Sequence, residues 1–558
     1  MKTIKIKIII ALALLIQLTA CLDLNEVNVS PNNAVSVSSN YILTYVLTGT
    51  AKSYVGLGDI GSDVSGAMQY IQNGTNQGAA SLNQFSWSRS SWSSQYDYLR
   101  NIKIIHDKSL TDNNKLFEAI SLVLRAFNYG IITDLFGDVP YSESLSAADG
   151  IYFSKYDDQK NIYKGILADL KAADALLADP GISAYKIDSN ADVLFKGSSV
   201  SWRKFANSLR MRFAMRLINK KADMTALGVD IVSEFNAAST FAFTSNSDDA
   251  FVSYIGTAAI NSAPGGLLNT ANPNFLAKPC KTIVDTLKSR NDPRLYRWVL
   301  PVNQKWDNKT TAITTKNYTN LFGETQSVIY YPNTSSTLDT SLFVGLPQNL
   351  AVIDLVGYNR GTAPASSNPE KSPWISFLHG RYRLNSETYV RMDLMCYSEV
   401  EFLLAEAAQR GGFSASDPET HYKNGILASM KRWGIVDGTG GFSFTAYYNS
   451  PKVNYASASN KLERIIDQKW LSLWLNVEPW FDYRRTGFPV LKTGPVTQYG
   501  SALPLRFMYP EPGLDPKYLV NYSEAVAKLE VTSYVPTGQS KDHSYSKMWL
   551  LQGTGKPY

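Results

Sequence analysis

The sequence predicts a mainly α-helical protein, in which a scaffold of paired helices carries long irregular loops and there is little β structure. Two observations support this fold class. Apolar residues recur at helical spacing in several segments on both sides of the middle of the chain. Between these helical blocks, residues 235–390 are rich in Asn, Thr, Ser, Gly and Pro and keep no clear period. We therefore expect one helical domain, residues 41–558, with a loop-rich insertion at about 235–390.

Six segments carry the helical period, and each has one apolar face. They come in pairs with short connections, which resembles helical-hairpin repeats of the tetratricopeptide kind, although no strict repeat length survives. The segments are 116–131, 162–177, 202–217, 400–407, 422–433 and 462–473. A further helix is expected to begin at Trp92 and to carry Tyr96 and Leu99.

The first twenty residues read as a secretory signal. Three lysines precede an apolar stretch, Ile8 to Ile16, that is too short to span a membrane. Leu18-Thr19-Ala20-Cys21 then matches the site that a bacterial lipoprotein signal peptidase cuts, although an ordinary signal followed by a cysteine remains the alternative. We predict a signal peptide at 1–20, lipid on Cys21, and a polar tether at 21–40 that leads into a helix. The mature chain is then held to a membrane by its lipid alone.

The charge of the mature chain argues against nucleic acid as a partner. Residues 1–20 hold three lysines and no acid, so their removal lowers the formal net charge from +6 to +3. No basic tract is present, whereas nucleic-acid-binding proteins concentrate Lys and Arg on one face. Aromatic residues make up 12% of the chain, which suits a protein that binds its ligand with flat ring faces.

Signatures of cofactor and metal sites are missing from the sequence. Its four histidines have no pair at ligand spacing, and neither a G-x-S-x-G elbow nor a phosphate-binding loop occurs. Asp188, Asn190 and Asp192 begin like a calcium loop, but the expected glycine and closing glutamate are absent. Cys280 and Cys396 could form one disulfide, and we favour two buried free thiols. We predict no cofactor, no metal and no enzymatic activity.

Two groups of carboxylates keep a secreted glycoside hydrolase open as an alternative, because two acids suffice for that reaction. Glu399 and Glu406 are seven residues apart on one helix face, and Asp134, Asp138 and Glu143 lie close together in sequence. The simpler interpretation is that these acids accept backbone N–H bonds or pair with arginines. A helical-repeat adaptor that binds only protein is the other alternative.

Four stretches resemble the successive signatures of SusD/RagB-type outer-membrane lipoproteins, in that family's order and after the cysteine motif. They are LRAFNYGIITDLFGDVPYSES (124–144), CYSEVEFLLAEAAQRG (396–411), IIDQKWLSLWLNVEPWFDYRRTGFP (465–489) and RFMYPEPGLDPKYLVNYSEAV (506–526). The resemblance implies an extracellular protein built on tetratricopeptide-like helix pairs. Such proteins bind glycans or other nutrients and deliver them to a TonB-dependent, SusC-like β-barrel transporter.

The resemblance also implies a location in the outer membrane, with the protein facing the cell exterior. Asp23 and Glu26, interleaved with Leu22, Leu24 and Asn25, form a weak version of the family's surface-export signal. Ligand contacts in this family lie in loops that differ between members, so the shared motifs identify none here.

The stretch NVEPWFDYRRTGFP (476–489) is dense in aromatic and charged residues but belongs to these shared motifs. We interpret it as a structural corner, since a feature common to proteins with different ligands does not choose the ligand. Asp482 is expected to pair with Arg484 or Arg485 and to hold the chain where it leaves a helix at Pro479. Trp202, Trp433, Trp470 and Trp474 fit helix faces and are expected in the core.

The candidate ligand-binding residues are aromatic and amide side chains in irregular segments. Sugars present hydroxyl edges and apolar C–H faces, so their sites combine exposed rings with hydrogen-bonding groups. The first segment, 70–92, supplies Tyr70, Asn73, Asn76, Gln84 and Trp87. The second lies around Trp306 and Tyr331.

Overall fold

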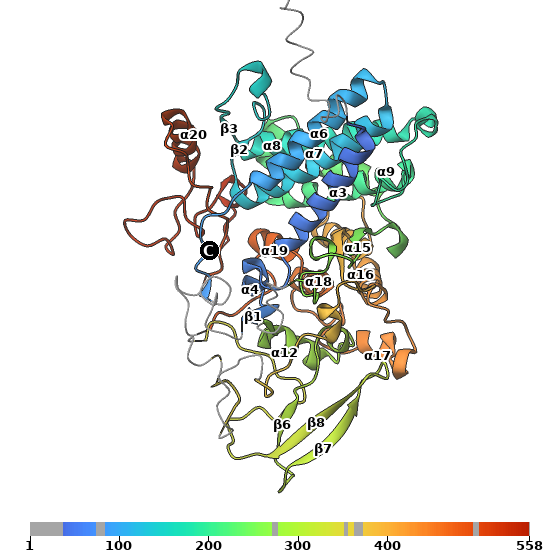
Figure 1. Cartoon of the computed structure of the whole chain (residues 1–558), viewed down its shortest axis with the longest axis vertical. Coiled ribbons are helices and arrows are strands. Elements are labelled where there is room, and N and C mark those ends of the chain that lie inside the picture. Colours follow the sequence, from blue (N-terminus) through green and yellow to red (C-terminus); the bar gives the residue numbers. More distant parts are fainter. Residues whose placement is uncertain are drawn as a thin grey trace, which may run out of the picture.

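The structure is a computed structural model that describes residues 37–73, 84–269, 277–350, 355, 357–361, 372–494 and 502–556. It is mainly helical and its strands are short, which confirms the predicted fold class. Figure 1 shows a layer of long helices at one end of the molecule and a three-stranded sheet at the opposite end. The expected signal peptide, Cys21 and all but the end of the tether lie outside the described residues.

The helical layer is built from helices that follow one another in the chain. Each packs against the next one in this order. They are α3 (Ser39–Gly56), α6 (Ser93–Thr111), α7 (Lys115–Phe136), α8 (Gln159–Ala178), α9 (Ser199–Arg216) and α11 (Ile231–Ser239). The predicted segments 116–131 and 162–177 lie inside α7 and α8, and the helix expected at Trp92 is α6, of which Trp92 is the N-cap.

Side-chain caps fix where several of these helices begin. The Ser38 hydroxyl accepts a hydrogen bond from the Asn40 N–H (3.3 Å), so α3 begins where the tether was expected to end. Asn114 caps α7 by accepting from the Phe117 N–H (3.2 Å), and Ser198 caps α9 in the same way. These groups satisfy N–H donors that the first helical turn leaves open.

Helix α7 is long and apolar enough to cross a membrane by length and composition alone. Almost all of its side chains are buried, and the helix packs between α6 and α8. Gly130 of α7 lets the Phe213 ring of α9 approach, because a Cβ there would lie 2.3 Å from a ring carbon. Helix α7 is therefore the central core helix of the layer.

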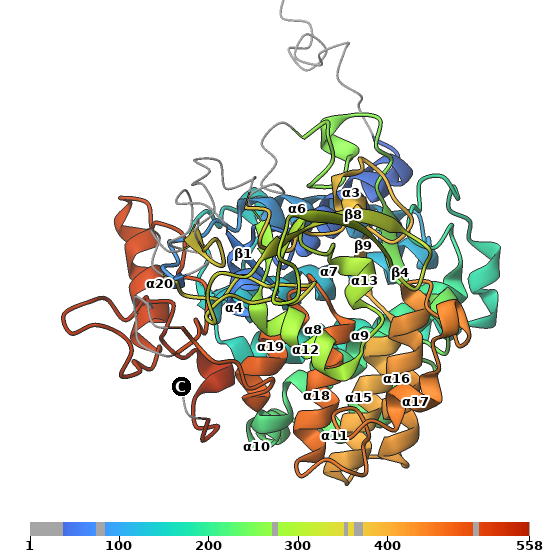
Figure 2. The same ribbon diagram turned by 90° about the horizontal axis from the view of Figure 1, so that it is seen from below.

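A second group of helices comes from the last third of the chain and packs on the first group through α9 and α15. They are α15 (Tyr397–Arg410), α16 (Pro418–Arg432), α17 (Phe444–Tyr448), α18 (Lys461–Ser472) and α19 (Glu478–Thr486). In Figure 2, α15 to α18 lie side by side next to α9. Helix α20 (Pro516–Ala527), near the end of the chain, lies apart from them at the opposite side of the picture. Trp202, Trp433, Trp470 and Trp474 are all buried, as expected.

The middle of the chain is more regular than its sequence suggests. It holds two short helices, α12 (Lys281–Arg290) and α13 (Leu295–Trp298), and a sheet in the order β6-β8-β7, parallel between β6 and β8. The sheet consists of β6 (Gln304–Asp307), β7 (Thr314–Thr319) and β8 (Thr325–Pro332). These elements are too short for a periodicity test to detect.

Three antiparallel strand pairs complete the fold by joining segments that are distant in sequence. Strand pairs this short are not stable in isolation. Here they connect the helical groups to the loops. The pairs are β1 (Ile71–Asn73) with β5 (Ala277–Pro279), β2 (Val139–Pro140) with β3 (Tyr156–Asp157), and β4 (Ala250–Ser253) with β9 (Arg391–Met395).

Candidate functional site

Two of the predicted ligand-binding rings lie inside the protein. Tyr70 is fully buried; its hydroxyl donates to the Trp470 carbonyl oxygen (2.5 Å), and its ring stacks on the Trp470 ring at 5.4 Å. Trp87 is 5% exposed and packs on Phe507 and Trp480, at centroid distances of 4.9 and 5.4 Å. Neither ring presents a free face to solvent. The structure therefore corrects the expectation that Tyr70 and Trp87 stand exposed in a surface loop.

Among the described residues, the amide side chains predicted beside Tyr70 and Trp87 do not form one group. Asn73 is half-buried at the end of β1, opposite Ala277, and Gln84 is half-buried ahead of Phe85. Asn76 lies outside the described residues. Their contact with a ligand stays a prediction without a described geometry.

The second predicted pair does come together, with a third ring. Trp306 of β6 and Tyr331 of β8 are neighbours in the parallel register, and their ring centroids lie 6.1 Å apart. Trp374 stacks on Trp306 at 4.5 Å and meets the Tyr331 ring edge-on at 5.1 Å. We call Trp306, Tyr331 and Trp374 the aromatic group. Its two tryptophans are buried and Tyr331 is half-buried, so Tyr331 is the member most exposed to solvent.

The surrounding loop fixes the aromatic group and supplies polar atoms. The Trp306 Nε1–H donates to the Asn359 carbonyl oxygen (2.8 Å), and the Asn359 amide donates to the Trp374 carbonyl oxygen (3.2 Å). Gly361 touches the Trp306 ring edge, because a Cβ there would lie 3.1 Å from Cζ2. Asn333 follows β8, exposed enough to meet solvent, and donates to the Asn308 amide oxygen (2.6 Å). Nothing in the sequence pointed to Asn359, because its contacts are long-range.

The corner motif is a buried ionic cluster. Asp482 pairs with Arg485 (2.7 Å) and with Lys469 of α18 (2.9 Å), while Arg485 also binds both carboxylate oxygens of Glu406. Arg484, one of the two partners expected for Asp482, instead donates to the carbonyl oxygens of Leu505 and Asp134 (2.7 and 2.8 Å). Pro479 lies in the first turn of α19 and does not mark a helix exit, which corrects that part of the prediction.

A second ionic cluster joins α9 to the same corner. Arg212 holds Glu399 through two hydrogen bonds (2.8 and 2.7 Å), and Arg216 pairs with Glu478 and with Asp134. All five side chains are buried. Glu399, Glu406 and Asp134, which the glycosidase alternative needed in an open cleft, are thus bound to arginines inside the core.

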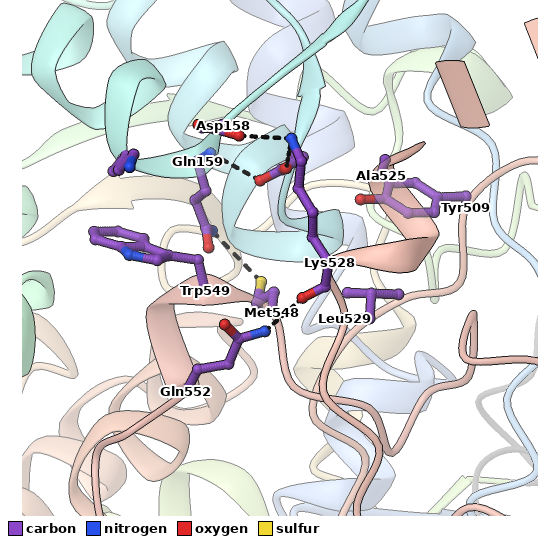
Figure 3. A pocket seen from close by; sticks show the side chains of 11 residues that line it. Asp158, Gln159, Tyr509, Ala525, Lys528, Leu529, Met548, Trp549 and Gln552 are labelled. Atoms are coloured by element: carbon purple, nitrogen blue, oxygen red, sulfur yellow. Dashed lines mark hydrogen bonds and ion pairs between the residues drawn. The ribbon is translucent and has the colours of Figure 1, made fainter. Parts of the chain in front are cut away.

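Asp138, another acid of that alternative, lines a pocket of about 190 Å³ (Figure 3). Its carboxylate accepts from the Gln159 N–H (2.8 Å) and from Lys528 (3.1 Å), whose ammonium also binds Asp158 (2.6 Å). Burial raises the pKa of Asp138, and the Gln159 N–H and Lys528 act against that rise. Both oxygens of the Asp138 carboxylate are therefore already hydrogen-bonded within the protein.

The residues considered for metal binding have other partners. Asp192 accepts the N–H groups of Leu194 and Gly197 and the indole N–H of Trp202 (3.1, 2.7 and 2.8 Å), so it organises a loop. Within the described ranges, no group of three or more His, Cys, Asp or Glu side chains is placed to hold a metal ion. Cys280 and Cys396 are buried free thiols, as favoured from the sequence.

Known proteins share this architecture. Among solved structures, a SusD homologue from Bacteroides fragilis is 24% identical and superposes with a TM-score of 0.68, covering 92% of this chain and 99% of its own. A second SusD homologue from the same organism is 21% identical with a TM-score of 0.70, covering 92% and 100%. A protein described as chitin-binding is 21% identical with a TM-score of 0.68 and the same coverage. No curated protein matches the chain.

A comparison with protein families agrees with the helix pairs, the corner motif and the sequence signatures. A family model described as "Starch-binding associating with outer membrane" matches residues 31–510, which span both helical groups and the loops between them. The match includes three of the four signature stretches completely and the start of the fourth. The chain belongs to the SusD-like family of outer-membrane-associated, glycan-binding proteins.

Proposed function

We propose that this protein is a lipid-anchored component of the outer-membrane surface, which captures a glycan or another oligomeric nutrient and delivers it to a TonB-dependent, SusC-like transporter. The family match over residues 31–510 carries the proposal. The cysteine motif that ends at Cys21 supports the anchor. We also propose that the protein faces the cell exterior, which the weak acidic export signal after Cys21 supports.

We place ligand capture at the aromatic group. Tyr331 offers a ring on a rigid support of two stacked tryptophans, and amides at Asn308 and Asn333 follow the ends of the same strands. Sugar rings bind such surfaces with their C–H faces on the aromatic ring and their hydroxyls on amides. The support is fixed before the ligand arrives, so binding does not have to order it.

The anchor is tested by replacing Cys21. Cys21→Ala should abolish incorporation of labelled palmitate and release the protein from the membrane fraction, whereas Cys280→Ala, at a buried free thiol, should leave both unchanged. Labelled fatty acid retained by Cys21→Ala would remove the anchor from the proposal.

Binding is tested with oligosaccharides by titration calorimetry on the mature chain. Because the family is described as starch-binding and one structural neighbour as chitin-binding, maltooligosaccharides and chitooligosaccharides come first, followed by a glycan array and a peptide mixture. Tyr331→Ala should lower the affinity for the ligand about tenfold, because ring stacking adds to the free energy gained from the buried area. Tyr330→Ala is the matched control, because neighbouring residues on a strand face opposite sides. An equal loss in both variants, or in neither, would move the site away from Tyr331.

A further inference from the structure

The aromatic group belongs to the sheet region, and the helical layer lies at the opposite end of the molecule (Figure 1). A separate cavity lies against helices α3 and α6 of that layer. We call it the α3–β4 cavity. Its volume is about 870 Å³, which is within the usual range for small-molecule sites. Helices α3 and α6, the turn at 193–196, strand β4 and the loop at 254–261 form its walls. Four rings line it: Tyr45, Tyr98, Phe251 and Tyr254.

The ring wall on the helices is held in place. The Tyr45 hydroxyl donates to the Asp97 carboxylate (2.6 Å), and its ring meets the Tyr98 ring edge-on at 5.9 Å. Gly49 of α3 is required for this arrangement, because a Cβ there would lie 2.4 Å from a Tyr98 ring carbon. The hydrogen bond to Asp97 and the edge-on contact therefore fix the Tyr45 ring against Tyr98.

Two loops complete the walls, and each is organised by one side chain. The Asp192 carboxylate holds the turn that presents Lys196, which adopts a left-handed conformation with φ of 57°. Across the cavity, the Asn261 amide oxygen accepts the N–H groups of Thr257 and Ala258 (3.0 and 2.9 Å). This second loop carries Ile260 to the surface, where its side chain is 77% exposed.

The charged residues that line the cavity are two lysines. Lys52 and Lys196 both line it, and among the described residues neither forms an ion pair with a carboxylate. The Lys52 ammonium donates to the Ile260 carbonyl oxygen (3.2 Å), which leaves further N–H donors available. Asp97 of α6, next to Tyr98, is already bound to Tyr45 and to Arg100 (2.9 Å).

We infer that the α3–β4 cavity binds an amphipathic anion, with an aromatic body between the rings and a carboxylate or sulfonate on Lys52 and Lys196. Rings and aliphatic side chains favour a planar apolar body, and two cations without acidic partners favour a negative group. This site is separate from the aromatic group and does not depend on the function proposed for Tyr331.

Titration calorimetry on the mature chain tests the inference with 1-naphthoate, which is anionic at pH 7, and with the neutral 1-naphthylmethanol. The anion should bind more tightly than the alcohol. Lys52→Gln and Lys196→Gln should each weaken naphthoate about two- to fivefold and leave the alcohol unchanged, since each removes one exposed charge contact. Lys103→Gln on α6 is the matched control, because that lysine pairs with Asp107.

A blocking variant locates the binding. Ser253 is exposed on β4 and lines the cavity, so Ser253→Trp should abolish naphthoate binding without entering the core. Tyr331→Ala should leave naphthoate binding unchanged, which separates this site from glycan capture. Three results would each overturn the inference: no saturable binding by the wild type, wild-type affinity for naphthoate in both lysine variants, or full binding by a folded Ser253→Trp protein.

Discussion

The Lys469 ammonium lies 2.9 Å from a carboxylate oxygen of Asp482, and both side chains are almost completely buried. Lys469 belongs to α18 and Asp482 to α19, so the pair joins the two helices that meet at the corner. Arg485 approaches the other oxygen of Asp482 at 2.7 Å and links the pair to Glu406 of α15. Removing any one charge from such a cluster leaves another charge buried without compensation.

Asp482→Asn should therefore destabilise the protein strongly while leaving ligand affinity of the folded protein unchanged. The substitution keeps the shape of the side chain but leaves Lys469 and Arg485 short of one negative charge in the core. Loss of one partner of a buried pair costs about 3–5 kcal/mol. Urea unfolding measures this cost, and Asp107→Asn, which breaks only an exposed pair with Lys103, should change the free energy of unfolding by less than about 1 kcal/mol. A variant that unfolds like the wild type but fails to bind ligand would make the corner a binding site.

The same cluster predicts a loss of stability in acid. Burial alone raises the pKa of Asp482, but Lys469 and Arg485 outweigh it and hold that pKa below its usual value. Arg485 and Arg410 do the same for the buried Glu406. Because the folded-state pKa values are depressed, the stabilisation is complete above the unfolded values near 4 and is lost as pH falls through the folded ones. Melting temperature should fall steeply below about pH 5, and less steeply in Asp482→Asn. Equal slopes for the two proteins would contradict this assignment.

The sequence predicted the helices better than the contacts. Helices α7, α8 and α9 are long and carry apolar residues at helical spacing, so periodicity alone finds them. Lys469 carried no such signal: a lysine in a helix is normally solvated, and its partner Asp482 lies thirteen positions later, beyond a turn. The prediction that Trp87 is exposed was wrong for the opposite reason. A polar neighbourhood suggested a surface, but Phe507 and Trp480, from distant parts of the chain, cover its ring.

Ionisation of the Asp59 carboxyl group should lower the free energy of unfolding as pH rises. Burial raises the pKa of its carboxyl group to about 7, and the hydrogen bond from the Ile60 N–H (2.6 Å) opposes this only in part. The folded protein therefore binds an extra proton between about pH 4, the unfolded value, and pH 7, and stability falls across that window. Asp59→Asn keeps an acceptor for Ile60 without the charge, so it should unfold at a higher temperature than the wild type at pH 8. We expect roughly 1–2 kcal/mol, less than the full shift implies, because the side chain is only half-buried. No difference at pH 8, or a larger one at pH 4, would contradict it.

Trp87→Ala should act on stability and not on ligand binding. The ring is 5% exposed, lies between Phe507 and Trp480, and fills space where α19 meets the segment around Phe507. Its removal should cost about 3–5 kcal/mol, as for the buried Trp470→Ala. Among the described residues, no acceptor meets the Trp87 Nε1–H, so Trp87→Phe gives up no hydrogen bond and should cost clearly less than Trp87→Ala. Urea unfolding of the three variants, with calorimetric titration of the glycan identified for the wild type, measures both effects. A Trp87→Ala protein of normal stability that has lost glycan affinity would show that the ring leaves this position to meet the ligand.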